Sequence, residues 1–175
     1  SWYENNGQES FTQHTIESGS AIHSVFAIDM DDDDDIDVLA ASYGGDYVAW
    51  YENNGADNFT KHTIDTPDNP RSVFAIDMDG DGDIDVLTAV LIDDDIIWYE
   101  NNGQESFTEH TIDEDFDGAM SVHAVDLDGD GDIDVLGAAE GANDIAWWKN
   151  DGSEDFTKNT IDASFGGAWD VNTAD

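Results

Sequence analysis

The sequence predicts an all-β fold, a β-propeller made of four-stranded antiparallel blades, and three observations lead to this prediction. One unit repeats every 48 or 49 residues: WYENNG starts at Trp2, Trp50 and Trp98, and it returns as WWKNDG at Trp147. Each unit contains four short strand-like runs separated by turns rich in Gly, Asn and Asp, without helical periodicity. Four strands at a period near 40 to 50 residues are typical of propeller blades.

The middle unit shows the expected elements in order. We expect strands at 72–78 (SVFAIDM), 84–90 (IDVLTAV), 96–100 (IIWYE) and 107–112 (FTEHTI). An Asp-rich loop joins the first two, and an NNG turn joins the last two, because Asn-Gly favours the positive φ of a tight hairpin. The first two runs are almost uniformly apolar, which predicts strands covered on both faces, whereas the last alternates with polar residues and predicts an outer edge.

The repeat predicts a single domain over residues 1–175. We expect a partial blade at 1–19, complete blades at 20–67, 68–116 and 117–165, and a partial blade at 166–175, or about 3.6 blades in all. An open ring would leave strand edges unpaired. Three explanations stay open: the chain is a slice of a larger propeller, neighbouring copies supply the missing partners, or four blades close imperfectly.

The charge of the chain limits which classes of molecule could bind to it. It has 43 acidic and 4 basic residues, a formal charge of −39 at pH 7, and no cysteine. This charge repels nucleic acid and anionic membranes. No apolar run approaches the roughly 18 to 20 residues that span a bilayer. Because cysteine is absent, disulfides and thiolate metal sites are excluded. The same charge opposes compaction unless cations screen it, which predicts a dependence on metal or salt.

A repeated acidic loop carries the candidate chemistry. In the middle unit it reads DMDGDGDID from Asp77 to Asp85, with carboxylates at positions 1, 3, 5 and 9 and glycine at position 6. Such a loop can wrap a hard cation in oxygens at roughly 2.3 to 2.6 Å, and the sharp turn at position 6 costs glycine least. Several carboxylates on a flexible loop favour Ca²⁺ over Mg²⁺, and zinc would want histidine or cysteine.

The predicted ligands of three calcium ions are the side chains at positions 1, 3, 5 and 9 and the backbone carbonyl at position 7. In the first loop these are Asp29, Asp31, Asp33, Asp37 and the carbonyl of Asp35. In the second loop they are Asp77, Asp79, Asp81, Asp85 and the carbonyl of Asp83. In the third loop they are Asp126, Asp128, Asp130, Asp134 and the carbonyl of Asp132. A merely solvated acidic turn is the alternative, but charge bias alone hardly produces three copies in one register.

The first loop departs from this pattern, because Asp32 and Asp34 stand where the other loops have glycine. Asp34 at position 6 tolerates a left-handed conformation better than most residues, yet with more strain than glycine. We expect this loop to bind calcium more weakly than the other two.

The motif DxDGDGDxDVL between two apolar strands, on a unit that also carries WYENNG, resembles the FG-GAP/VCBS repeats of integrin-like β-propellers. The resemblance covers essentially the whole chain. It implies a calcium ion in the hairpin between the first and second strands of each blade, usually in a secreted or cell-surface protein. The family contains integrin α-subunits, fungal lectins, polysaccharide-acting enzymes and bacterial surface proteins, so it implies fold and calcium but no particular activity.

Two other sets of repeated residues are expected to be structural. Trp50, Trp98 and Trp147 could stack on sugars, but a large aromatic at one place in every blade is more typical of packing between blades. His14, His62 and His110 become Asn159 in the fourth copy, which favours a structural hydrogen bond over catalysis or metal binding. Trp169 lies outside the repeated tryptophan position and is a slightly better candidate for a surface contact.

The leading hypothesis is a non-enzymatic calcium-binding propeller module of a secreted or cell-surface protein, serving adhesion, assembly or scaffolding. Its expected partners are calcium ions, other copies of the chain through open blade edges, and glycans. The alternatives are a lectin-like module and a domain of a polysaccharide-acting enzyme. The enzyme is disfavoured because four basic residues could hardly neutralise an acidic polysaccharide, and no catalytic Ser/His/Asp constellation is visible.

Overall fold

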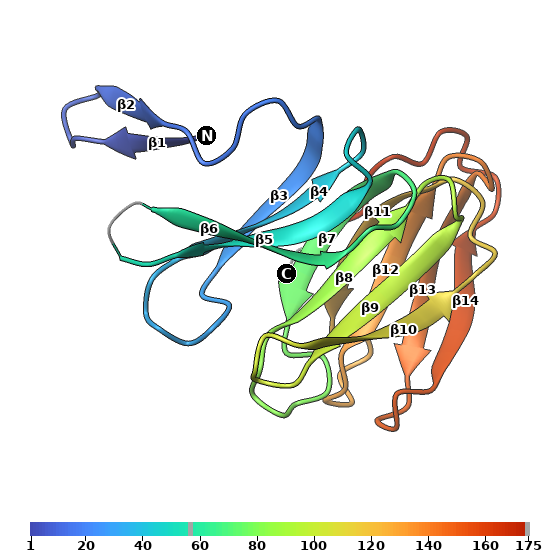
Figure 1. The fold of residues 1–175 in the computed structure, drawn as a ribbon. Coiled ribbons are helices and arrows are strands. Elements are labelled where there is room, and N and C mark those ends of the chain that lie inside the picture. Colours follow the sequence, from blue (N-terminus) through green and yellow to red (C-terminus); the bar gives the residue numbers. More distant parts are fainter. Residues whose placement is uncertain (56–57, 174–175) are drawn as a thin grey trace.

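The chain forms three four-stranded antiparallel sheets and one separate hairpin (Figure 1), as seen in a computed structural model that describes residues 1–55 and 58–173. The hairpin pairs β1 (Trp2–Asn5) with β2 (Phe11–His14). No helix occurs among the described residues, so none there could cross a membrane. The predicted all-β class and the repeated four-stranded sheets are confirmed.

Each sheet follows the order of the chain, so neighbouring strands are always joined by a short connection. Sheet 1 contains β3 (Ile22–Ile28), β4 (Asp37–Ser42), β5 (Tyr47–Asn53) and β6 (Phe59–Asp65). Sheet 2 contains β7 (Pro70–Ile76), β8 (Asp85–Val90), β9 (Asp95–Asn101) and β10 (Phe107–Asp113). Sheet 3 contains β11 (Ala119–Val125), β12 (Asp134–Ala139), β13 (Asp144–Asn150) and β14 (Phe156–Asp162). The predicted strands of the middle unit are all present, and the first starts and ends two residues earlier than predicted.

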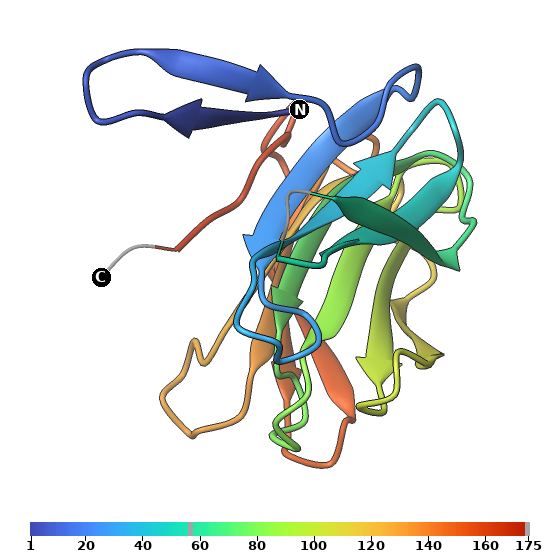
Figure 2. The same cartoon turned by 60° about the vertical axis from the view of Figure 1, so that its left-hand side comes forward.

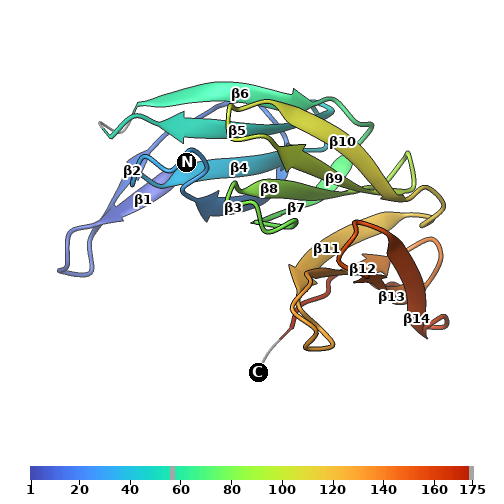
Figure 3. The ribbon, with the colours of Figure 1, turned by 90° about the horizontal axis from the view of Figure 1, so that it is seen from below.

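The three sheets stack face to face in chain order, with β3, β7 and β11 next to one another (Figure 3). Leu39 and Trp50 pack with Val73 in the core between sheets 1 and 2. Trp98 and Phe116 belong to the core between sheets 2 and 3. Burial of these apolar faces is the main favourable term that joins the sheets.

The first strand of each sheet is covered only where another sheet precedes it. Val73 of β7 and Val122 of β11 are each 4% exposed, but Val25, at the same repeat position in β3, is 63% exposed. The prediction that first strands are covered on both faces is therefore wrong for β3. The second strands β8 and β12 are buried throughout, and β6, β10 and β14 lie at sheet edges as predicted.

The two ends of the described chain lie outside the three sheets. The β1–β2 hairpin projects away from them (Figure 2). Residues 166–173, expected to start another blade, contain no strand, and residues 174–175 lie outside the described part. This segment nevertheless runs along β11, because the Val171 amide donates to Ser121 Oγ at 3.3 Å, just as the Val73 amide donates to Ser24 Oγ at 3.3 Å.

The repeated tryptophans fill the cores where two sheets meet, as predicted. Trp50 and Trp98 are 1% exposed, and they stack on His62 and His110 with ring centroids 4.6 and 4.5 Å apart. Trp147 of sheet 3 is only partly buried. The histidines have the expected structural bonds, because their Nε2 atoms bind the glutamates two residues after each tryptophan, at 2.8 and 2.7 Å.

Candidate metal centres

The acidic loops lie between the first and second strands of each sheet, and their first aspartate organises the turn. Asp77 accepts hydrogen bonds from the Gly80 and Gly82 amides at 2.8 and 3.1 Å. Asp126 accepts the equivalent bonds from the Gly129 and Gly131 amides, whereas Asp29 accepts from the Asp33 and Asp34 amides. The loop backbone is thus folded around the carboxylate at position 1, which keeps lone pairs free for a cation.

The last aspartate of each loop is buried beneath it. Asp85 is fully buried, and its two oxygens accept bonds from the amides of Asn101 at 2.7 Å and Met78 at 3.0 Å. Burial raises the pKa of Asp85 to about 7. Asp37 and Asp134 are also buried with equivalent amide bonds, and burial raises the pKa of both. Burial disfavours the charged form of each of these carboxylates, and a neighbouring cation would favour it.

Three carboxylates converge in every loop, with one oxygen of each within 4.8 Å of the others. In the second and third loops they come from positions 1, 3 and 9, whereas in the first loop they come from positions 1, 3 and 5. The clusters are Asp29, Asp31 and Asp33; Asp77, Asp79 and Asp85; and Asp126, Asp128 and Asp134. The predicted ligands Asp37, Asp81 and Asp130 lie outside them. These all-oxygen sets fit a hard cation such as Ca²⁺.

The aspartate at position 7 points toward the NNG turn of the same sheet. The Asp83 carboxylate lies so close to Gly103 that a methyl group on this glycine would overlap it, and Asp35 and Asp132 lie the same way against Gly55 and Gly152. Gly103 also has a φ of 70°, a backbone conformation that favours glycine. This direction is compatible with position 7 contributing its carbonyl, which stays a prediction.

The first loop adopts the same backbone as the others despite its two extra aspartates. Asp32 and Asp34 have φ values of 66° and 70°, and Gly80 and Gly82 have values of 79° and 102° at the same positions. A left-handed conformation costs most L-residues roughly 1 to 2 kcal/mol; aspartate pays less than most, and glycine avoids this cost. The strain expected at Asp34 is therefore present.

Lys149 is a residue that the sequence reasoning did not connect with the loops. Its Nζ forms an ion pair with Asp128 and lies 2.9 Å from Asp130 Oδ2. This ammonium holds the pKa of Asp130 below its usual range. Comparison of WYENNG with WWKNDG could have signalled it, because lysine replaces a repeated glutamate there.

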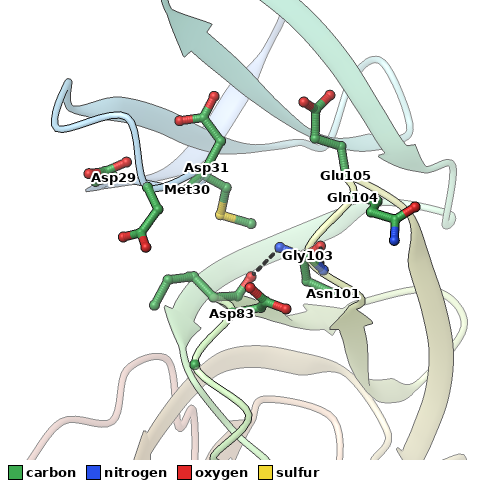
Figure 4. A pocket seen from close by; sticks show the side chains of 11 residues that line it. Asp29, Met30, Asp31, Asp83, Asn101, Gly103, Gln104 and Glu105 are labelled. Atoms are coloured by element: carbon green, nitrogen blue, oxygen red, sulfur yellow. Dashed lines mark hydrogen bonds between the residues drawn. The ribbon is translucent and has the colours of Figure 1, made fainter.

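A pocket of about 120 Å³ lies between the first acidic loop and the NNG turn of sheet 2 (Figure 4). Asp29 and Asp31 line it from sheet 1, while Asp83, Asn101 and Glu105 line it from sheet 2. The pocket therefore joins two neighbouring sheets, and four of these five side chains are acidic.

Comparison with known proteins follows the repeat. The FG-GAP-like repeat family matches residues 29–88, 89–136 and 126–175. No curated protein matches the chain. One solved structure with a similar fold is that of an Agrocybe aegerita lectin, described as showing specific recognition of non-reducing terminal N-acetylglucosamine. The two share a TM-score of 0.62 and 21% sequence identity, and the match covers 94% of this chain and 48% of the lectin chain. The chain thus spans about half the length of that lectin chain.

Proposed function

The chain belongs to the FG-GAP-like repeat family, and from this premise we propose that it is a non-enzymatic β-propeller module held together by structural calcium. The three sheets would be blades. The buried aspartate at position 9 carries the proposal. Asp85 starts the second strand of its blade, and it accepts hydrogen bonds from the Met78 amide, two residues after the first strand ends, and from the Asn101 amide at the end of the third strand. A cation at this carboxylate would stabilise the point where three strands meet.

The calcium ligands would be those that the loop spacing predicts: the side chains at positions 1, 3, 5 and 9 and the carbonyl at position 7. When bound, calcium supplies the positive charge that offsets each aspartate cluster. Because the folded chain alone presents these clusters, the binding free energy adds to the free energy of unfolding.

Removal of calcium should therefore destabilise the chain strongly. Three sites occupied at 100 times Kd would contribute about 8 kcal/mol, which corresponds to roughly 15 to 30 °C in Tm for a chain of this size. Scanning calorimetry in calcium and in excess EGTA measures the shift, with magnesium as the ionic control. An unchanged Tm in EGTA would contradict the proposal.

We place this module on a secreted or cell-surface protein, serving adhesion, assembly or scaffolding. Extracellular modules use calcium sites with Kd near 0.1 to 1 mM, and a strained loop such as the first would suffice there. Calcium titration by calorimetry tests this placement, because nanomolar affinity at all three loops would instead indicate an intracellular calcium buffer.

Another copy of the chain is one proposed partner. Sheet 1 exposes one whole face to solvent, not only a strand edge. Val25 on this face is 63% exposed, whereas Val73 and Val122, at the same repeat position in sheets 2 and 3, are 4% exposed because a preceding sheet covers them. A sheet from a second copy would cover it in the same way. Sedimentation velocity in calcium tests this contact, with Val25→Asp as the variant that should stay monomeric. If the wild-type chain also stays monomeric at high concentration, the contact is excluded.

Glycan recognition is the second candidate function, favoured by the fold shared with the lectin and by an exposed aromatic. Trp169 is 62% exposed next to Asp170, which binds Ser121 Oγ at 3.0 Å. An aromatic face beside a fixed polar group suits stacking on a sugar ring. Titration with N-acetylglucosamine should then give binding that Trp169→Ala abolishes without a change in Tm. If the wild-type chain does not bind the sugar, glycan recognition is excluded and only the role as a calcium-stabilised module is left.

A further inference from the structure

One position near the acidic loops changes its charge along the repeat. The third strand carries glutamate two residues after its tryptophan in sheets 1 and 2, at Glu52 and Glu100, but Lys149 stands there in sheet 3. The partner on the fourth strand changes with it. Glu52 and Glu100 bind histidines, whereas in sheet 3 the histidine is replaced by Asn159, whose amide donates to Thr157 O at 2.9 Å.

The side chain of Lys149 is therefore not engaged by the fourth strand and turns to the loop. Its Nζ pairs with Asp128, a member of the third carboxylate cluster, and lies 2.9 Å from Asp130 Oδ2. Both aspartates are predicted calcium ligands. The ammonium thus occupies two of the four carboxylates that the third loop offers.

Sheet 2 shows the opposite electrostatic setting. There Glu100 stands at the repeat position of Lys149, and its carboxylate binds His110. Asp79 occupies the position of Asp128 and Glu100 occupies the position of Lys149, so the two sheets carry opposite charges at the same place in the repeat. Glutamate there adds negative charge for an incoming cation, and lysine adds positive charge against it.

We propose that Lys149 is a built-in competitor of calcium, which makes the third loop a weaker site than the second, the other loop with glycine at position 6, and the least dependent on calcium for its folded form. The proposal rests on calcium binding as the proposed function. A calcium ion bound at Asp128 and Asp130 has to displace the ammonium and then lies beside it. A change of two charges about 6 Å from a divalent ion alters affinity roughly 10- to 100-fold after solvent screening.

The same ammonium has a second consequence when calcium is scarce. It neutralises part of the carboxylate repulsion in the third loop, so this loop should stay folded where the other two open. Opening of exposed loops is measurable residue by residue by hydrogen exchange. In EGTA, amides of 126–134 should be better protected than amides of 77–85, and in Lys149→Met this difference should disappear.

Calcium titration of the full chain tests the competition. In the wild-type chain the third loop should bind calcium more weakly than the second. Lys149→Met should tighten calcium at the third loop, and Lys149→Glu, which introduces the residue of sheets 1 and 2, should tighten it by roughly 10- to 100-fold. Glu100→Lys is the matched reverse variant and should weaken one of the stronger sites. The Tm of each variant in saturating calcium checks that it folds.

The outcomes separate the two proposals. Calcium binding by the wild-type chain with affinities that neither Lys149→Met nor Lys149→Glu changes would overturn the competition and leave calcium as the structural ion. A wild-type chain that binds no calcium and melts equally with and without EGTA would overturn both proposals.

Discussion

Replacing Glu109 by lysine should stabilise the chain at neutral pH, because it restores a cation that two sister positions already have. In all three sheets an aromatic side chain on the third strand binds an acidic residue that lies before the first strand of the sheet. Tyr51 binds Glu17, Tyr99 binds Asp65 at 2.9 Å, and Trp148 binds Asp113 at 3.0 Å. Lys61 lies 3.6 Å from Glu17, and Lys158 lies 3.0 Å from Asp113. Sheet 2 has Glu109 at this place.

The magnitude follows from Asp95, which starts the third strand of sheet 2. Burial and then the charges of Asp93, Glu109, Glu114 and Asp94 raise the pKa of Asp95 to about 6, from an ordinary value of 3.8. A difference of this size corresponds to about 3 kcal/mol, and solvent screening at a partly exposed group reduces it to about 1 to 2 kcal/mol. The destabilisation is absent below about pH 4, grows as the pH rises, and is complete above about pH 6.

Glu109→Lys removes one of the repelling charges and adds an attracting one. We expect a gain of about 1 kcal/mol at pH 7, or roughly 2 to 4 °C in Tm, that shrinks as the pH falls to 4. Thermal unfolding in saturating calcium, followed by circular dichroism from pH 4 to 7.5, measures it. Glu9→Lys makes the same charge change at an exposed turn of the N-terminal hairpin and is the control.

Two results would refute this reasoning. One is an equal Tm change in Glu109→Lys and Glu9→Lys at pH 7, because a general reduction of net charge would then explain it. The other is a gain in Glu109→Lys that does not vary between pH 4 and 7, because Asp95 would then not be the group relieved.

Three further experiments test the packing and the loops. Gly103→Ala should lower the free energy of unfolding by about 1 to 2 kcal/mol in urea titrations, because φ is positive and the Asp83 carboxylate has to move aside; a neutral result would contradict the strain expected at this φ. Trp98→Ala should lower the free energy of unfolding by about 3 to 5 kcal/mol in the same assay, whereas replacing the exposed Trp169 by alanine should lower it by less than about 0.5 kcal/mol. Similar values for the two variants would contradict the placement of Trp98 in the core. Asp34→Gly should tighten calcium at the first loop by up to about tenfold and Gly82→Asp should weaken the second, as read by calorimetry; unchanged affinities would remove the argument from strain.

The strands and the loops could be predicted from the sequence because their causes are local. Alternating or continuous apolar runs set which residues form strands, and Asn-Gly turns set where hairpins close. The acidic loop could also be recognised, since its aspartates lie within nine residues of one another. The left-handed φ of Asp34 follows from the same short-range pattern, because the other loops have glycine there.

Other properties depend on residues that are distant in the chain. Asp85 is as acidic a residue as Asp81 in the sequence, but it alone lies beneath the loop, where burial raises its pKa to about 7. Lys149 reaches Asp130 from nineteen residues away because β12 and β13 pair in one register. Val25 and Val73 have the same place in the repeat, and a packed sheet covers only the second. Local patterns specify strands, turns and candidate ligands, whereas burial, charge neutralisation and uncovered faces depend on which elements meet across the sheets, and those contacts exist only in the folded chain.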